Sequence, residues 1–324
     1  MKKIVVLDGY TMNPGDLSWS ALEEFGRLTV YDQTPESMAD ERIGDAEIVL
    51  TSKVTFDRKR LCAFPGIKYI GVLATGYNVI DVQTAADLGI TVTNIPEYAT
   101  MATAQATIAL LLELSNRVGH HDRLVHDGKW MQTPHFCFWD GPLIELSGKT
   151  LGLYGYGRIA KTVARVAREL GMTVLACGRP GSEGTSLPED DPAAPSTVSK
   201  EELFKRSDFL SLHCPLTEQT YRLIDENAIR DMKDGAFLIN AARGPLIDEK
   251  AVADALCAGK LSGVAVDVLS VEPAKPDNPL LYAPNCIITP HIAWAPLETR
   301  ARLIRTAVSN LRAFLSDNPE NVVS

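Results

Sequence analysis

The sequence has 324 residues, of which 45% are hydrophobic and 23% are charged. A chain of this length exceeds the roughly 250–300 residues at which a single core stops growing, so two domains are expected. The formal net charge of −9 disfavours a nucleic acid or an anionic membrane surface as the main partner. An anionic ligand would therefore require cationic side chains gathered at one place.

The six cysteines are scattered, and none of them shows a C-x-x-C pairing or a cysteine–histidine spacing of the zinc type. We interpret them as reduced thiols of a cytoplasmic protein without a metal site. The apolar run after the N-terminal MKK is too short for a secretory signal. The most apolar stretch, Ala106–Leu112, is too short to span a bilayer, so no membrane association is expected.

Short apolar runs, many of them β-branched, alternate with helical patterns from the N-terminus onward. The expected strands are Ile4–Leu7, Ile48–Leu50, Tyr69–Leu73, Val92–Ile95, Leu151–Tyr154, Val174–Cys177, Phe209–His213, Ala236–Asn240 and Gly263–Val266. The expected helices are Ala102–Arg117, Arg158–Leu170, Asp248–Ala258 and a segment from Ala295 almost to the C-terminus. Strands separated by helices are typical of parallel sheets. We predict an α/β fold with two doubly wound parallel-sheet domains, Rossmann-like or flavodoxin-like, and a cleft between them.

The predicted domains are residues 1–100 together with 296–324, and residues 101–295. The first is discontinuous because the C-terminal helix is expected to pack back on the first block of strands. Within the second, residues 178–199 are rich in Pro, Gly, Ser and Asp, a composition that predicts a long surface loop.

The stretch "TLGLYGYGRIAKTVARVAREL" places Gly155, Gly157 and Ala160 in a G-x-G-x-x-A spacing, after a predicted strand and at the start of a predicted helix. The first glycine allows a tight turn, the second allows the backbone to approach a pyrophosphate, and a small third residue lets the helix pack on the strand. Amides at the helix N-terminus then face the phosphates. This context predicts a dinucleotide site, whereas the glycine spacing alone would also suit a turn without a ligand.

The second strand of this motif ends at Gly178, followed by Arg179, where an NAD site would carry a carboxylate about 20 residues after the glycines. Without that carboxylate nothing repels a 2′-phosphate, and a guanidinium can pair with one. We therefore favour NADP(H) over NAD(H). In the alternative interpretation Arg179 points to solvent, and NAD binds through other contacts.

Four blocks resemble the D-isomer-specific 2-hydroxyacid dehydrogenase family over nearly the whole chain. They are "GVLATGYNVID" (71–81), "GLYGYGRIA" (152–160), "LINAARGPLIDEKAV" (238–252) with "GVAVDVLSVEP" (263–273), and "ITPHIAW" (288–294). A further stretch, "FCFWDGPLIELSGKT" (136–150), is similar to the glycerate dehydrogenase, or hydroxypyruvate reductase, branch. The resemblance implies that the second domain binds the dinucleotide and that the first binds the substrate.

The resemblance implies a catalytic set of Arg243, Glu272 and His291. An imidazole, with an ordinary pKa of about 6.5, suits the proton transfer that accompanies hydride transfer to a carbonyl carbon. A carboxylate beside it fixes its tautomer and favours its protonated form. The fork of an arginine can bind carboxylate and carbonyl oxygens together. Taken singly, each of these residues could be structural, and a metal role for His291 lacks partner ligands.

The resemblance also implies that the substrate contacts Ala74, Thr75 and Gly76, besides Arg243 and His291. Successive amides in such a turn form an anion-binding nest. Asp267 matches the family position that accepts from the nicotinamide carboxamide. The predicted cofactor contacts are Gly155, Tyr156, Gly157, Arg158, Ile159, Gly178, Arg179, Cys214, Pro215, Ala241 and Asp267.

The predicted activity is reduction of hydroxypyruvate or glyoxylate to D-glycerate or glycolate by NAD(P)H. One alternative is a reductase of another 2-oxo acid, of the D-lactate type. Another is a non-catalytic NAD(H)-binding scaffold of the corepressor kind, although the intact Arg-Glu-His set favours turnover. The resemblance further implies a homodimer, in which Trp139 helps to close the active site of the neighbouring subunit.

Overall fold

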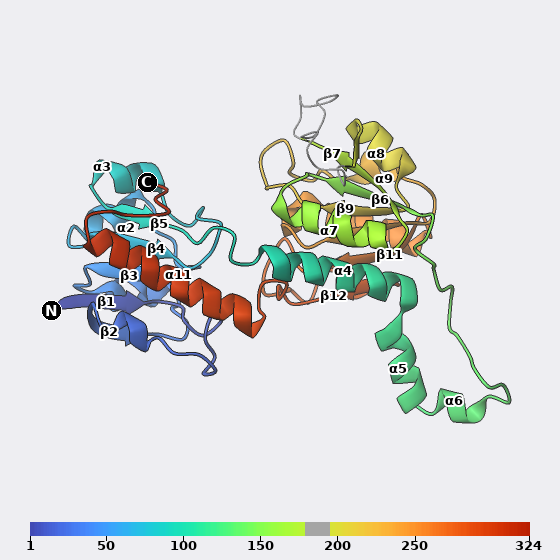
Figure 1. Ribbon diagram of the computed structural model, residues 1–324, viewed down its shortest axis with the longest axis horizontal. Coiled ribbons are helices and arrows are strands. Elements are labelled where there is room, and N and C mark those ends of the chain that lie inside the picture. The colour runs from blue at the N-terminus through green and yellow to red at the C-terminus, as the bar shows by residue number, and fades with distance from the viewer. Residues whose placement is uncertain (179–194) are drawn as a thin grey trace. The chain divides into compact units, whose positions relative to one another are not determined.

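The computed structural model describes residues 1–178 and 195–324 (Figure 1). The chain divides into two compact units, which we describe separately. Unit 1 comprises Met1–Ala99 and Trp294–Ser324, and unit 2 comprises Thr100–Ala293. The predicted α/β fold with two parallel-sheet domains is confirmed.

Unit 1 contains a five-stranded parallel sheet of order β2-β1-β3-β4-β5. Its strands are β1 (Lys2–Val6), β2 (Gly26–Val30), β3 (Ile48–Thr51), β4 (Tyr69–Val72) and β5 (Thr91–Thr93). Its helices are α1 (Ala39–Ile43), α2 (Arg58–Ala63), α3 (Val82–Asp87) and α11 (Leu297–Leu315).

The helix α11 covers one face of this sheet, although more than 200 residues separate it from β5 in the chain. Its buried residues Leu303, Ala307 and Leu311 share a core with Ile4 and Tyr69. Buried residues of α1, α2 and α3 form a second core on the other face. Both faces are therefore buried, which explains the nearly unbroken apolar runs of the central strands.

Unit 2 contains a seven-stranded parallel sheet of order β12-β11-β10-β9-β6-β7-β8. Its strands are β6 (Thr150–Tyr154), β7 (Thr173–Cys177), β8 (Ser196–Thr197), β9 (Phe209–Leu212), β10 (Ala236–Asn240), β11 (Leu261–Val266) and β12 (Cys286–Ile288). Helices α4 (Thr100–Asn116) and α7 (Arg158–Glu169) pack on one face, and α8 (Lys200–Arg206), α9 (Glu226–Asp231) and α10 (Glu249–Cys257) pack on the other. All of these strands except β8 contribute side chains to the two cores, and neighbouring residues such as Val174 and Leu175 of β7 lie in opposite ones.

After α4, the helices α5 (Val118–His126) and α6 (Lys129–Gln132) extend away from the sheet of unit 2, and the chain returns along a loop to β6 (Figure 1). This arm carries large apolar side chains that are at least half exposed: Val118, Trp130, Met131, Phe136, Trp139 and Leu143.

Two expectations about unstructured or membrane-spanning segments can be compared with the structure. Most of the loop predicted over residues 178–199, residues 179–194, lies outside the described residues. The last part of the prediction is wrong, because Ser196–Thr197 pair with β7 as strand β8 and Ser199 caps α8. Within the described ranges, the helices are all too short or too polar to cross a bilayer.

Candidate active site

The glycine turn of unit 2 follows β6, at the centre of the sheet. Gly155 has φ +93°, and a Cβ atom there would lie 2.7 Å from the carbonyl oxygen of His213. The Gly155 amide donates to the carbonyl of Cys177 at the end of β7. Only glycine combines this backbone conformation with such close approach, so the turn is fixed between the ends of β7 and β9.

Gly157 differs from Gly155, because a Cβ atom there would meet no protein atom within 4 Å. Gly157 is also the N-cap of α7, and it offers no side-chain acceptor to the first amides of this helix. A helix N-terminus approached by bare backbone is the arrangement that binds a pyrophosphate. The residues present therefore fit a dinucleotide, with Tyr156, Arg158 and Ile159 in the turn and first helical residues.

The loop after β9 contains two of the predicted cofactor contacts, Cys214 and Pro215. Burial raises the pKa of the Cys214 thiol to about 11 and lowers the pKa of His213 to about 4. The Pro215 carbonyl accepts from the Thr220 hydroxyl at 2.7 Å. Because the Cys214 thiol stays protonated and a hydrogen bond closes the loop at Pro215, we assign this segment a packing role.

Gly178 follows β7 and is half-buried. Arg179, on which the predicted preference for NADP(H) depends, lies outside the described residues.

The end of β10 shapes the loop that carries Arg243. The buried Asn240 side chain accepts from the Ala242 amide at 3.0 Å and donates to the Arg243 carbonyl at 2.8 Å. These two bonds close a turn around Ala241 and turn the exposed Arg243 outward. One guanidinium nitrogen donates to the Ala242 carbonyl at 2.7 Å, and Arg243 forms no ion pair with any residue that the structure describes. Its remaining donors suit an anionic ligand.

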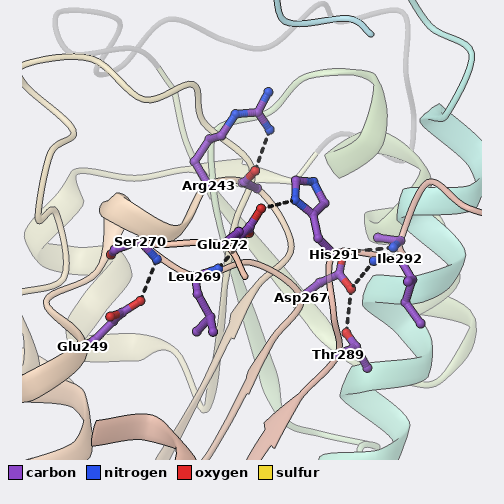
Figure 2. Close-up of polar contacts among 11 residues, drawn as sticks. Arg243, Glu249, Asp267, Leu269, Ser270, Glu272, Thr289, His291 and Ile292 are labelled. Atoms are coloured by element: carbon purple, nitrogen blue, oxygen red, sulfur yellow. Dashed lines mark hydrogen bonds and ion pairs between the residues drawn. The ribbon is translucent and has the colours of Figure 1, made fainter. Parts of the chain in front are cut away.

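Glu272 and His291 form the central polar contact of the site. The Glu272 Oε2 atom lies 2.6 Å from Nδ1 of His291, and each side chain is 33% exposed. The other carboxylate oxygen, Oε1, accepts from the Leu269 amide at 3.0 Å. The carboxylate thus fixes one ring nitrogen, which leaves Nε2 to exchange a proton with a ligand. Figure 2 shows Arg243 and His291 extending beyond the strand ends on the same side.

The backbone of His291 adopts the left-handed conformation, with φ +56°. This conformation costs a residue other than glycine about 1–3 kcal/mol, so the surrounding structure must stabilise it. Asp267 does so from the end of β11: its carbonyl accepts from the His291 amide at 2.8 Å. Its carboxylate accepts from the Thr289 hydroxyl and from the amides of Ile292 and Ala293.

Asp267 is 2% exposed, and these contacts engage both of its carboxylate oxygens. Its predicted contact with a nicotinamide carboxamide stays a prediction. The observed role is to hold the loop that carries the imidazole.

The loops of Arg243 and Glu272 are packed backbone against backbone. A Cβ atom on Gly244 would lie 2.0 Å from the carbonyl carbon of Leu269 and 2.4 Å from the Ser270 nitrogen. No side chain fits there without separating the two loops. The glycine therefore couples the position of Arg243 to that of Glu272.

In unit 1, the predicted substrate loop follows β4. The carbonyls of Ala74 and Thr75 accept from the Ile95 amide and the Asn94 side chain, at 3.0 and 2.7 Å. The amides of Thr75 and Gly76 bond to no acceptor among the residues described. Because the carbonyls already have donors while these amides bond to no acceptor among the described residues, the loop can donate hydrogen bonds to an anion.

The structure brings Arg243, Glu272 and His291 to the carboxyl edge of one sheet, from the loops after β10, β11 and β12. Ligands bind at this edge in open parallel sheets. Sequence reasoning missed Asn240, Gly244 and Glu249, which shape these loops. In the sequence, Asn240 is marked only by its position at the end of a predicted strand, and Glu249 only by its position at the start of a predicted helix.

Residues 108–293 match the family model for the NAD-binding domain of D-isomer-specific 2-hydroxyacid dehydrogenases, which covers more than half of the chain. The chain belongs to this family. A hydroxypyruvate reductase of Blautia hydrogenotrophica is 50% identical, and the alignment covers 99% of each chain. The predictions of the family and of an NAD(P)-dependent oxidoreductase are confirmed.

Solved structures of the 2-hydroxyacid dehydrogenase family superpose on the whole chain. An NADPH-dependent glyoxylate/hydroxypyruvate reductase from Sinorhizobium meliloti is 25% identical, with a TM-score of 0.83 and coverage of 100% of this chain and 98% of the other. A D-lactate dehydrogenase from Aquifex aeolicus, complexed with NAD and lactic acid, is 28% identical, with a TM-score of 0.82 and coverage of 98% and 96%. Relatives of this fold therefore use either coenzyme.

Proposed function

We propose that the protein reduces hydroxypyruvate or glyoxylate to D-glycerate or glycolate with NAD(P)H. The single observation that carries this proposal is the 2.6 Å contact between Glu272 and His291, near Arg243, which forms no ion pair among the described residues. The similarity to a hydroxypyruvate reductase over 99% of both chains supports the choice of substrate.

Arg243 binds the anionic substrate in this proposal. Its fork pairs with a carboxylate oxygen and the neighbouring carbonyl oxygen, which fixes the orientation of the carbonyl carbon. The amides of Thr75 and Gly76 are proposed as further donors to the substrate carboxylate.

His291 supplies the proton. Reduction places negative charge on the carbonyl oxygen, and the imidazolium donates from Nε2 to that oxygen as the charge develops. Glu272 holds Nδ1 and stabilises the imidazolium by its negative charge. In the oxidative direction the neutral imidazole takes the proton back.

The glycine turn would hold the coenzyme, and Gly157 with the N-terminal amides of α7 would bind its phosphates. A bound nicotinamide coenzyme supplies the hydride for the reduction. Asp267 and Ala241 are proposed to contact its nicotinamide end, and Gly178, Cys214 and Pro215 to line its groove.

The substrate proposal is tested by assaying hydroxypyruvate, glyoxylate, pyruvate and longer 2-oxo acids, each with NADH and with NADPH. We expect the highest kcat/KM for hydroxypyruvate or glyoxylate. A preference for pyruvate would instead indicate the D-lactate type. Tight coenzyme binding without reduction of any 2-oxo acid would overturn the enzymatic proposal in favour of a scaffold.

NADP(H) is proposed as the preferred coenzyme, because Arg179 replaces the carboxylate that an NAD site would carry next to Gly178. Replacing Arg179 by Asp introduces a charge that repels a 2′-phosphate. We expect the ratio of kcat/KM for NADPH over NADH to fall at least tenfold. An unchanged ratio would dismiss the role of Arg179.

We also propose a homodimer formed through the arm of α5 and α6. The exposed apolar side chains of the arm are what an interface would bury. Asp140, next to Trp139, is tied to the start of the arm, because His120 Nε2 lies 2.8 Å from its carboxylate and its amide donates to His121. Trp139 is 68% exposed beside this anchored residue, which suits an anchor for a partner subunit.

Analytical ultracentrifugation tests the dimer. The wild-type protein is expected to sediment as a dimer, and Met131→Asp combined with Phe136→Asp as a monomer. Trp139→Ala is expected to lower kcat/KM if it contributes to the neighbouring subunit's site. A monomeric wild-type protein would remove both proposals.

A further inference from the structure

Glu249 lies 21 residues before Ser270 in the chain, and it is the first residue of α10. Its side chain is directed away from solvent toward the loop between β11 and β12, as Figure 2 shows. Oε1 accepts from the Ser270 amide at 2.7 Å, and Oε2 accepts from the Asn278 side chain at 3.0 Å. One carboxylate therefore holds two points of the same loop.

These two points lie on either side of Glu272. Ser270 is two residues before it, and the neighbouring Leu269 amide donates to Glu272 Oε1. Asn278 is six residues after it. Its side chain is buried and caps the short helix η4 (Pro279–Leu281). The segment between them is exposed, so its conformation depends on these two anchors and on the Tyr282 hydroxyl, which donates to the Pro276 carbonyl at 2.8 Å.

We propose that Glu249 is a positioning residue for the reaction, which fixes the loop so that the Glu272 carboxylate meets His291 Nδ1. This role rests on the proposed function, since Glu249 is given no contact with a ligand and acts on the reaction only through Glu272. Its effect on catalysis passes through the 2.6 Å contact between Glu272 and His291.

The charge of Glu249 suits this role. A carboxylate in the first turn of a helix is stabilised by the positive end of the helix dipole, which offsets part of the cost of partial burial. A charged acceptor also binds amide donors about twice as strongly as a neutral one. A glutamine could accept from the Ser270 amide, but its own NH2 group would then face the NH2 group of Asn278.

The test is a double-mutant cycle between Glu249→Ala and Glu272→Gln, measured as kcat for the preferred 2-oxo acid. In the wild-type background we expect Glu249→Ala to lower kcat by ten- to a hundredfold, since small misplacements near reacting groups have effects of that order. In the Glu272→Gln background the same change is expected to lower kcat less than about threefold. Coenzyme affinity, measured by fluorescence, is expected to stay within twofold throughout.

Two further variants keep the test decisive if Glu249→Ala folds poorly. Asn278→Asp preserves the helix cap but places a second carboxylate against Glu249, and it is expected to lower kcat at least fivefold. Lys250→Ala changes the next residue of α10, whose partner is the exposed Asp254, and is expected to leave kcat unchanged.

A pH profile separates positioning from general loosening. Because a displaced Glu272 no longer stabilises the imidazolium, the alkaline limb of kcat for reduction is expected to move to lower pH in Glu249→Ala. Equal effects of Glu249→Ala in both backgrounds would overturn the positioning role while leaving the proposed function intact. An unaffected kcat in Glu272→Gln itself would instead overturn the proposed catalytic set.

Discussion

In each of the two sheets, one strand is followed by a buried aspartate whose carboxylate holds the loop after a neighbouring strand. In unit 1, Asp8 follows β1 and accepts from the amides of Ser52 and Lys53, at 2.9 and 2.6 Å, in the loop after β3. In unit 2, Asp267 follows β11 and accepts from the amides of Ile292 and Ala293, at 2.9 Å each, after β12. In both loops the carboxylate accepts hydrogen bonds from backbone amides that have no backbone acceptor.

The two edges differ in what these aspartates support. Asp267 holds a titratable residue, His291, in a strained conformation beside Glu272. Asp8 holds the loop after β3, and Thr75 and Gly76 follow the neighbouring strand β4. The same structural device therefore supports the proposed proton donor in unit 2, whereas in unit 1 it holds the loop after the strand next to the one that precedes the proposed substrate amides.

The sharpest contrast concerns pH, because burial shifts the pKa of a different titratable group in each unit: a half-buried histidine in unit 2 and a core tyrosine in unit 1. Burial lowers the pKa of His213 in unit 2 to about 4. The unfolded state therefore binds a proton below pH 6.5 that the folded state does not, and the free energy of unfolding falls as pH drops from 6.5 to 4. The loss attributable to His213 is expected to reach about 3 kcal/mol.

In unit 1, burial raises the pKa of Tyr69 above its usual value. The unfolded state then loses a proton above pH 10 while the folded state keeps it, so stability attributable to Tyr69 is lost as pH rises past 10. Urea unfolding of wild type, His213→Gln and Tyr69→Phe measures both effects as differences. His213→Gln should reduce only the acid dependence, and Tyr69→Phe only the alkaline one. Identical pH profiles in all three proteins would refute this contrast.

Exchanging each aspartate for asparagine tests the difference in function. Asp267→Asn leaves at least one buried donor without an acceptor, at a cost of about 1–3 kcal/mol, and it releases the loop of His291. We expect kcat to fall about a hundredfold. Asp8→Asn is expected to destabilise the fold similarly and to raise KM, while kcat stays within threefold. A larger loss of kcat in Asp8→Asn would reverse the assignment of the two edges.

The two glycines of the turn after β6 give a comparison within unit 2. A Cβ atom at position 157 meets no protein atom within 4 Å, so Gly157→Val should keep its melting temperature but lose coenzyme affinity at least tenfold. Gly155→Val is expected to destabilise the fold, because the new Cβ meets the His213 backbone. Calorimetry and fluorescence titration measure the two properties. Normal coenzyme affinity in Gly157→Val would exclude this turn as the phosphate site.

The smallest effects are expected from the hydroxyls that support the aspartates. The Thr289 hydroxyl donates to Asp267 at 2.6 Å and the Thr51 hydroxyl donates to Asp8 at 3.2 Å. Replacing either by valine should cost about 1 kcal/mol of stability. Only Thr289→Val should also lower kcat, by about two- to fivefold. Steady-state kinetics with urea unfolding would show whether the two variants differ.

The sequence was most informative where a pattern has a single physical explanation. Apolar runs predicted the strands that are buried on both faces, such as β4 and β9, and the glycine spacing predicted the turn before α7. The edge strand β2 was missed because four of its five residues are not buried, and β12 because it has only three residues.

The site was predictable as a set of residue types but not as a geometry. Arg243, Glu272 and His291 followed from the family resemblance, whereas Glu249 and Asn240 act by contacts between segments distant in the sequence or by turn closure. Nothing in the local pattern around Asp267 indicates that its carboxylate holds the backbone after β12. Such contacts depend on which strands become neighbours, which is a property of the folded sheet.

His291, held by Glu272, is proposed to supply the proton at the carboxyl edge of unit 2. Single-turnover oxidation of the bound reduced coenzyme by hydroxypyruvate, followed by stopped flow, tests it in wild type and His291→Gln. The account predicts a rate at least about a hundredfold lower in the variant, with the dissociation constant of the coenzyme unchanged within twofold. A variant rate within threefold of wild type would contradict it.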